Sequence, residues 1–155
     1  MKGTTIAEQA HVVNALGPVD TGSVAKVSDY FCLKKYAHAT IVVTTGAVTN
    51  AATITVEESD DKDGSNTTAI AFAYYAELTA AGDTLGNRTA ATSAGFSTGT
   101  NNNCTFVIEI DAAELTDGYP YLVVKATNAA ACLISIVAIL SGARFQGDPT
   151  PTAIT

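Results

Sequence analysis

The chain has 155 residues and a formal net charge of −7, and only 15% of its residues are charged. This length fits one domain that buries a core without a metal or a disulfide, and the negative charge argues against binding a nucleic-acid backbone, which needs clustered Lys and Arg. Ala and Thr are frequent, with 27 and 23 copies, so we expect flat sheets and a neutral surface that a partner can cover at little desolvation cost.

Residues 1–27 predict an N-terminal arm outside the folded domain. Large apolar side chains are few in this segment, and burying them does not repay the backbone entropy lost on ordering. A short helical stretch is expected around residues 7–16. We expect the arm to bind a partner through its apolar residues: Ile6, Val12, Val13 and Leu16. The arm should be mobile in an isolated subunit, and its deletion should leave the rest of the chain folded.

Residues 37–58 predict a β-hairpin, preceded by a short strand at residues 28–33. Every residue of Thr40–Thr45 is β-branched, which favours a pleated strand over a helix. Further along, Ile54 and Val56 alternate with polar residues, the period of a strand with one dry face. The link Gly46–Asn50 has the composition of a hairpin loop. We therefore expect these two strands to pair.

The rest of the chain predicts further strands separated by turns. One helical turn is expected at residues 112–115, and Asp117-Gly118 is a turn pair. The expected strands are Thr67–Leu78, a short one near Arg88–Thr92, Cys104–Asp111, Tyr119–Ala126 and Ala131–Leu140. One face of Thr67–Leu78 carries Ile70, Phe72 and Tyr74, and one face of Cys104–Asp111 carries Phe106, Ile108 and Ile110. Ala131–Leu140 is the most apolar, and we expect both of its faces to be covered. Seven or eight strands predict an all-β fold, an antiparallel β-sandwich or jelly roll over residues 28–146. An extended tail with two prolines follows at residues 147–155.

Acidic side chains provide two candidate sites. The loop Ser59–Ser65 resembles a calcium loop in part, but Ser59 and Ile70 stand where the first ligand and the bidentate Glu are needed. A solvated hairpin tip and a weak cation site both remain open for this loop. Glu109 and Asp111 share one face of a strand, and we expect that face to meet water rather than to carry out acid–base catalysis.

The remaining reactive residues do not form a recognisable catalytic or metal motif. The two histidines, His11 and His38, are far apart in the sequence, and no GxSxG motif is present. The three cysteines lack a CxxC spacing and are expected to be free, buried thiols. Four tyrosines leave open a sugar-binding platform, although core or interface packing is the expected use: Tyr74, Tyr75, Tyr119 and Tyr121. We expect no enzymatic activity and no cofactor.

Targeting signals are also not indicated. The N-terminus lacks the basic and apolar regions of a secretory signal, and the apolar run at residues 129–140 is too short to span a membrane. We expect the protein to fold in the cytoplasm where it is made.

Several segments resemble small virion proteins of tailed bacteriophages. They are residues 1–6 (Met-Lys-Gly-Thr-Thr-Ile), 8–9 (Glu-Gln), 17–20 (Gly-Pro-Val-Asp), 28–40 (Ser-Asp-Tyr-Phe-Cys-Leu-Lys-Lys-Tyr-Ala-His-Ala-Thr), 106–115 (Phe-Val-Ile-Glu-Ile-Asp-Ala-Ala-Glu-Leu) and 139–145 (Ile-Leu-Ser-Gly-Ala-Arg-Phe). Proteins of this kind are similar to capsid decoration, or cement, proteins. The resemblance implies a non-enzymatic role on the head surface and β-rich oligomers, often trimers. The acidic loop and the pair Tyr74-Tyr75 have no counterpart in it.

The leading hypothesis is a virion protein, made in the host cytoplasm, that binds and stabilises the assembled capsid. Its expected partners are the major capsid protein and further copies of itself, with a trimer favoured, and neither nucleic acid nor a membrane is expected. The alternative is a receptor- or glycan-binding module of a phage fibre or spike. Co-sedimentation with capsids or with host cell surfaces separates the two.

Overall fold

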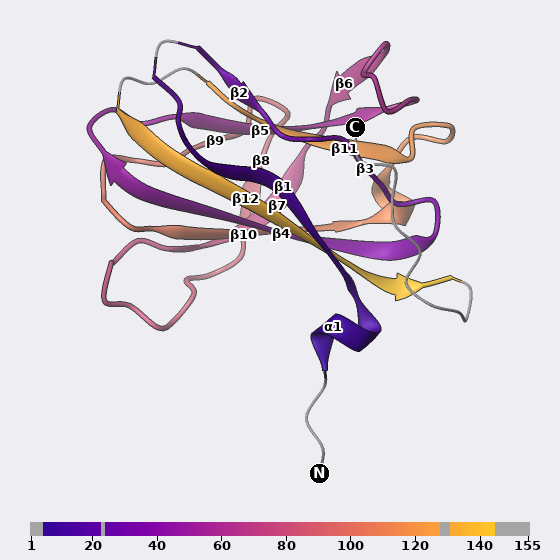
Figure 1. The fold of residues 1–155 in the computed structure, drawn as a ribbon, viewed down its shortest axis with the longest axis horizontal. Helices are drawn as coiled ribbons and strands as arrows, with labels where there is room; N and C mark the ends of the chain where they lie inside the picture. The colour runs from indigo at the N-terminus through magenta and orange to yellow at the C-terminus, as the bar shows by residue number, and fades with distance from the viewer. Residues whose placement is uncertain (1–4, 23, 128–130, 145–155) are drawn as a thin grey trace.

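The protein is an all-β sandwich of two antiparallel sheets (Figure 1). The computed structural model describes residues 5–22, 24–127 and 131–144. The predicted fold class is thus confirmed as a β-sandwich, and the predicted C-terminal tail at 147–155 lies outside the described residues.

Sheet A has six strands, in the order β1-β12-β4-β10-β7-β8. Their bounds are β1 (His11–Asp20), β12 (Cys132–Ala143), β4 (Tyr36–Val48), β10 (Thr105–Asp111), β7 (Phe72–Glu77) and β8 (Thr89–Ala91). A short helix, α1 (Ile6–Gln9), precedes β1.

Sheet B is formed around β11 and β5, in the order β2-β11-β5-β6, with β3 also paired to β11 and β9 to β5. The strands are β2 (Lys26–Val27), β3 (Phe31–Cys32), β5 (Thr53–Ser59), β6 (Thr67–Ala69), β9 (Phe96–Ser97) and β11 (Tyr121–Ala126). The predicted helical turn is confirmed as the 3₁₀ helix η1 (Ala112–Glu114), which joins β10 to β11.

The core lies between the sheets and follows the period of two. In β10, Phe106, Ile108 and Ile110 are buried while their neighbours are not, as predicted. Phe96 of β9 stacks on Tyr74 of β7, with ring centroids 4.1 Å apart. Alternation therefore directs one set of side chains from each sheet into the same dry layer.

The predicted hairpin over residues 37–58 is wrong, although both of its strands exist. β4 pairs with β12 and β10 in sheet A, whereas β5 pairs with β11, β6 and β9 in sheet B. Both strands have an apolar face, and placing them on opposite sides of the core buries both faces. The predicted strand 67–78 is likewise divided, into β6 in sheet B and β7 in sheet A.

The described part of the predicted arm is a helix followed by strands of the sandwich. β1 pairs with β12 along its length, with register shifts after Asn14 and Leu16. Val13 and Ala15 are 1% and 2% exposed. β1 gains its stability from the hydrogen bonds and packing of β12, which compensate for its weak apolar content. Lys26–Val27 is also a strand, paired with β11, so strands of both sheets occur within residues 1–27.

The prediction that both faces of the last strand are covered is also wrong. β12 alternates, with Ile134, Ile136 and Ala138 buried, whereas Leu133 on its other face is 44% exposed. Sheet A is one layer of a two-layer sandwich, and among the described residues the outward side chains of β12 are partly or fully exposed.

Candidate docking face

The outer face of sheet A carries a row of apolar side chains across four strands. Val107 of β10 stands opposite both Tyr75 of β7 and Val42 of β4, and Val42 stands opposite Val137 of β12. All four are partly exposed. The outer face of an antiparallel sheet is usually polar, so an apolar row indicates a binding surface. We call these four residues the apolar row.

Three further apolar residues lie near the edge of the sheet and beside α1. Val12 of β1 stands opposite Ile139 of β12, and Val12 and Ile6 of α1 are each 52% exposed. A hollow of about 380 Å³ lies between the helix and the sheet, lined by Ile6, Gln9, Ala10, Thr40, Ile139, Ser141 and Gly142. We call Ile6, Val12 and Ile139 the edge cluster.

The structure divides the four predicted partner-binding residues into two pairs. Ile6 and Val12 are exposed and belong to the edge cluster. Val13 is 1% exposed and Leu16 packs against the core of its own chain. Val13 and Leu16 are therefore corrected to core residues. Val13 points inward through the regular alternation of β1, and the register shift between Asn14 and Leu16 turns Leu16 to the same side.

The loop between β7 and β8 projects on the same side of the sandwich as α1, below sheet A in the view of Figure 1. The carboxylate of Glu77 accepts hydrogen bonds from the backbone N–H and hydroxyl of Thr79, at 2.9 and 2.6 Å, and from the N–H of Thr84 at 3.1 Å. These bonds, those from Thr79 first, lower the pKa of Glu77. The loop so ordered presents Leu78 and Leu85, which are 48% and 45% exposed.

A charged cluster borders the apolar row on β4 and β10. The ring of His38 contacts Asp111 through Nδ1 at 2.7 Å and Glu109 through Nε2 at 2.6 Å, and the Thr40 hydroxyl donates to the same Glu109 oxygen at 2.7 Å. Burial by itself lowers the pKa of His38, whereas the hydrogen bonds and charges of the two carboxylates raise it, and the net result is a pKa above the ordinary value of 6.5.

This cluster confirms that Glu109 and Asp111 face outward. Sequence reasoning did not connect them with His38, because His38 is distant in the chain and becomes a neighbour only through the register in which Asp111 stands opposite His38. The imidazole of His38 thus has a carboxylate beside each of its two ring nitrogens.

The outer face of sheet B carries polar and charged side chains on β5 and β11. On β5 and β11 it presents Thr55 and an ion pair between Lys125 and Glu57, with Nζ and Oε2 2.5 Å apart. The tyrosines do not form a shared platform: Tyr74 packs inward on Phe96, and Tyr75 faces the opposite side of β7. The apolar row is therefore a property of sheet A.

The acidic loop is held by hydrogen bonds among its own residues. Asp61 Oδ1 accepts the N–H groups of Asp63 and Ser65, each at 3.0 Å, which closes the acidic loop on itself. Hydrogen bonds, first those with Ser65, lower the pKa of Asp61.

Within residues 5–22, 24–127 and 131–144, no group of three or more His, Cys, Asp or Glu is arranged to hold a metal ion. All three cysteines are free thiols, with Cys104 and Cys132 buried. No helix among the described residues is long and apolar enough to span a membrane.

The likeness of this chain to a known protein is one of fold rather than of sequence. No protein-family model matches the sequence, and no curated protein matches it. Among solved structures, the crystal structure of the SPBc2 prophage-derived protein YomS is similar, with a TM-score of 0.52 and 13% sequence identity. The similarity covers 91% of this chain and 99% of YomS. The chain therefore shares its fold, over nearly its whole length, with a protein derived from a prophage.

Proposed function

We propose that the protein is a non-enzymatic virion protein of a tailed phage that binds the assembled capsid through the outer face of sheet A. The observation that carries this proposal is the apolar row, which crosses four neighbouring strands in register. Three steps between strands of about 4.8 Å give the row a length of roughly 14 Å. A partner that covers it gains apolar burial without desolvating a charge in the row itself.

The fold supports the phage part of the proposal, because the similar protein YomS is described as prophage-derived. The neutral Thr- and Ala-rich composition supports the role in a lattice, since such a surface is covered at little desolvation cost. The partner on the capsid is the major capsid protein, and the protein is located on the capsid surface of the virion.

The edge cluster serves a second contact in this proposal, between copies of the chain. Ile6, Val12 and Ile139 lie near the edge of sheet A that β1 forms, where a neighbouring copy can cover the exposed side chains of α1 and β1. Closed cyclic symmetry is the usual arrangement of such contacts, and we favour a trimer.

The test is co-sedimentation of the purified protein with capsids of the phage that encodes it. Val42→Asp places a charge in the middle of the apolar row and should weaken capsid binding at least about tenfold, since burying an unpaired carboxylate is costly. The matched control is Thr55→Asp, which introduces the same charge on the outer face of a central strand of sheet B. It should bind as the unmodified protein does.

Circular dichroism and thermal unfolding must first establish that both variants are folded. Equal capsid binding by the two variants contradicts the proposed face. Binding of the unmodified protein to host cells but not to capsids contradicts the proposed function and supports the receptor- or glycan-binding alternative.

A further inference from the structure

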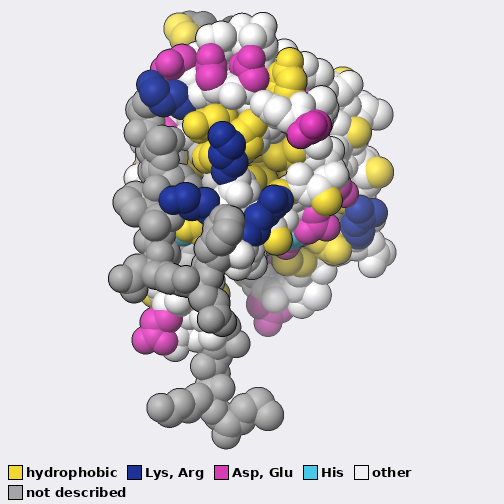
Figure 2. All heavy atoms as spheres, turned by 90° about the vertical axis from the view of Figure 1, so that its right-hand side faces the viewer, with side chains coloured by type: hydrophobic (Ala, Val, Ile, Leu, Met, Phe, Trp, Pro, Cys, Tyr) yellow, Lys and Arg dark blue, Asp and Glu magenta, His cyan; other side chains and the backbone are white. Residues whose placement is uncertain are grey.

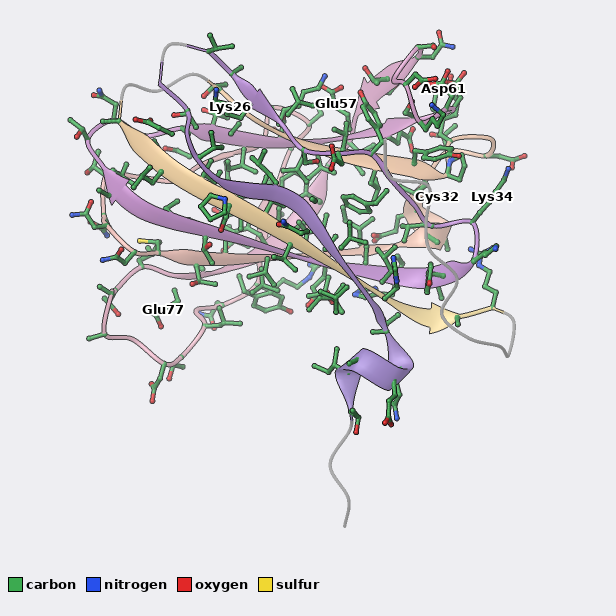
Figure 3. The ribbon with its side chains drawn as sticks, viewed as in Figure 1. Lys26, Cys32, Lys34, Glu57, Asp61 and Glu77 are labelled. Atoms are coloured by element: carbon green, nitrogen blue, oxygen red, sulfur yellow. The ribbon has the colours of Figure 1, made fainter. Side chains whose placement is uncertain are left out.

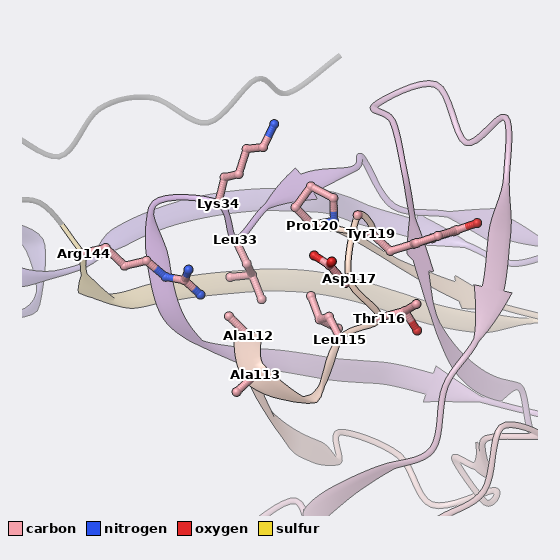
Figure 4. Close-up of a pocket in the computed structure, with 11 residues that line it drawn as sticks. Leu33, Lys34, Ala112, Ala113, Leu115, Thr116, Asp117, Tyr119, Pro120 and Arg144 are labelled. Atoms are coloured by element: carbon pink, nitrogen blue, oxygen red, sulfur yellow. The ribbon is translucent and has the colours of Figure 1, made fainter.

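A second surface lies at one end of the sandwich, away from the β7–β8 loop. Figure 3 places Lys34 at this end and Glu77 at the opposite one. Here the turn between β3 and β4, the η1–β11 connection and the end of β12 surround a hollow of about 260 Å³ (Figure 4). Its accessible apolar lining includes Ala112 and Leu115, which are partly buried and pack against the core, whereas Leu33 is 1% exposed and belongs to the core itself. The floor of the hollow is therefore apolar.

The walls are held in place by hydrogen bonds to the body of the sandwich. Glu58, which is 3% exposed, accepts the N–H of Thr116 at 2.8 Å, and the carbonyl of Pro120 accepts the N–H of Leu33 at 2.8 Å. The Asp117-Gly118 turn is closed by a bond from the N–H of Tyr119 to the carbonyl of Thr116, at 2.9 Å. Such a hollow is formed before a ligand arrives, which reduces the ordering cost of binding.

Two cations and one acid line this hollow. Lys34 and Arg144 line the hollow, and in the part of the chain that the structure describes, neither side chain forms an ion pair. Figure 2 looks at this end and shows Lys and Arg side chains beside a hydrophobic patch, with Asp and Glu side chains along the top of the same view. In Figure 4, Arg144 reaches toward Leu33 from one side, and Asp117 lies on the other side.

We propose that this hollow binds a short segment of a partner protein in which an apolar side chain is followed by a carboxylate. The apolar side chain occupies the floor, where its burial is favourable. The carboxylate accepts two N–H groups from the guanidinium of Arg144 and is attracted by Lys34. On the opposite wall, Asp117 accepts a backbone N–H of the segment and disfavours the reverse orientation.

An inorganic anion leaves the apolar floor unfilled, and a purely apolar segment leaves both cations unused. The combination of an apolar floor with cations on one wall therefore selects the mixed segment. This site lies on different residues from the apolar row, so the two proposals stand or fall separately.

The test is a titration of the full ¹⁵N-labelled chain with the peptide acetyl-Gly-Gly-Leu-Glu-Gly-amide, followed by NMR. Saturable shifts are expected at the amides of Ala113, Thr116 and Gly118. Two control peptides replace Glu by Gln or Leu by Ala, and each should bind about tenfold more weakly because it lacks one of the two contacts.

A protein variant provides the second arm of the experiment. Arg144→Gln together with Lys34→Gln should remove the preference for the Glu peptide over the Gln peptide. Arg88→Gln is the matched control, because Arg88 is an exposed arginine outside the hollow, and this variant should bind as the unmodified chain does.

Three outcomes overturn the proposal. The first is the absence of saturable shifts at the hollow with the Leu-Glu peptide. The second is equal binding of the three peptides, or an equal effect of the two protein variants. The third is a shift of the same amides on concentrating the chain without peptide, which identifies a second copy as the occupant.

Discussion

The charge of His38 depends on residues that the fold brings beside it. The two carboxylates raise its pKa above 6.5 although burial opposes them. Because the pKa is higher in the folded chain than in the unfolded one, the stabilisation is fully present below about pH 6.5 and is lost as the pH rises through the higher folded value. The side chains of His38 and Asp111 are 30% and 65% exposed, so solvent screens the interaction and the loss should not exceed about 1 kcal/mol.

Urea unfolding between about pH 5 and about pH 9 measures this effect, since the range brackets the titration of histidine. The difference in the free energy of unfolding between the unmodified chain and His38→Gln should shrink as the pH rises. The matched control is His11→Gln, because the ring of His11 stacks on Tyr36 instead, with centroids 6.2 Å apart. A pH profile that His38→Gln leaves unchanged would show that the cluster contributes no pH-dependent stability.

At the scale of elements, β1 is a strand of the sandwich rather than a separate arm, and two adjacent valines test this. Val13 points into the core and is 1% exposed, whereas Val12 points outward and is 52% exposed. Val13→Ala should lower the free energy of unfolding by about 2 kcal/mol, through lost burial and a cavity. Val12→Ala should change it by less than about 0.5 kcal/mol, as exposed substitutions usually do.

Urea denaturation of the two variants gives both free energies of unfolding.

Deletion of residues 1–20 should prevent stable folding, because it removes the hydrogen-bonding partner of β12 along one edge of sheet A. The composition of the N-terminal segment alone had predicted the opposite, that its deletion leaves the rest of the chain folded. Equal and small effects of the two valine substitutions would instead support the arm.

On the scale of the whole molecule, the edge cluster and the apolar row are expected to have separate partners. We expect sedimentation at micromolar concentration to show an oligomer without a capsid present. Val12→Asp should yield monomers, because it places a charge among the apolar side chains that a neighbouring copy covers. Val42→Asp should leave the oligomer intact and affect capsid binding alone. A monomer for the unmodified chain, or dissociation by Val42→Asp, would contradict this division.

The sequence by itself determined the type of fold and the identity of its main strands. Alternation places Ile54 and Val56, or Phe106, Ile108 and Ile110, on one face whatever the partner strand is, because successive side chains of a strand point in opposite directions. Turn chemistry also acts locally, and the Asp117-Gly118 pair forms a turn in which Gly118 has a φ of 88°. The outward direction of Glu109 and Asp111 follows from the same alternation.

Only the tertiary structure decided which strands are neighbours and which apolar residues remain exposed. The period of two does not distinguish a hairpin from two strands on opposite sides of a core, so β4 and β5 were predicted as partners although they lie in different sheets. Composition likewise does not reveal that β12 supplies the partner of β1 from the far end of the chain. The apolar row and the His38 cluster depend on register between distant strands, which is a non-local property, and so they appear only when the sheet is assembled.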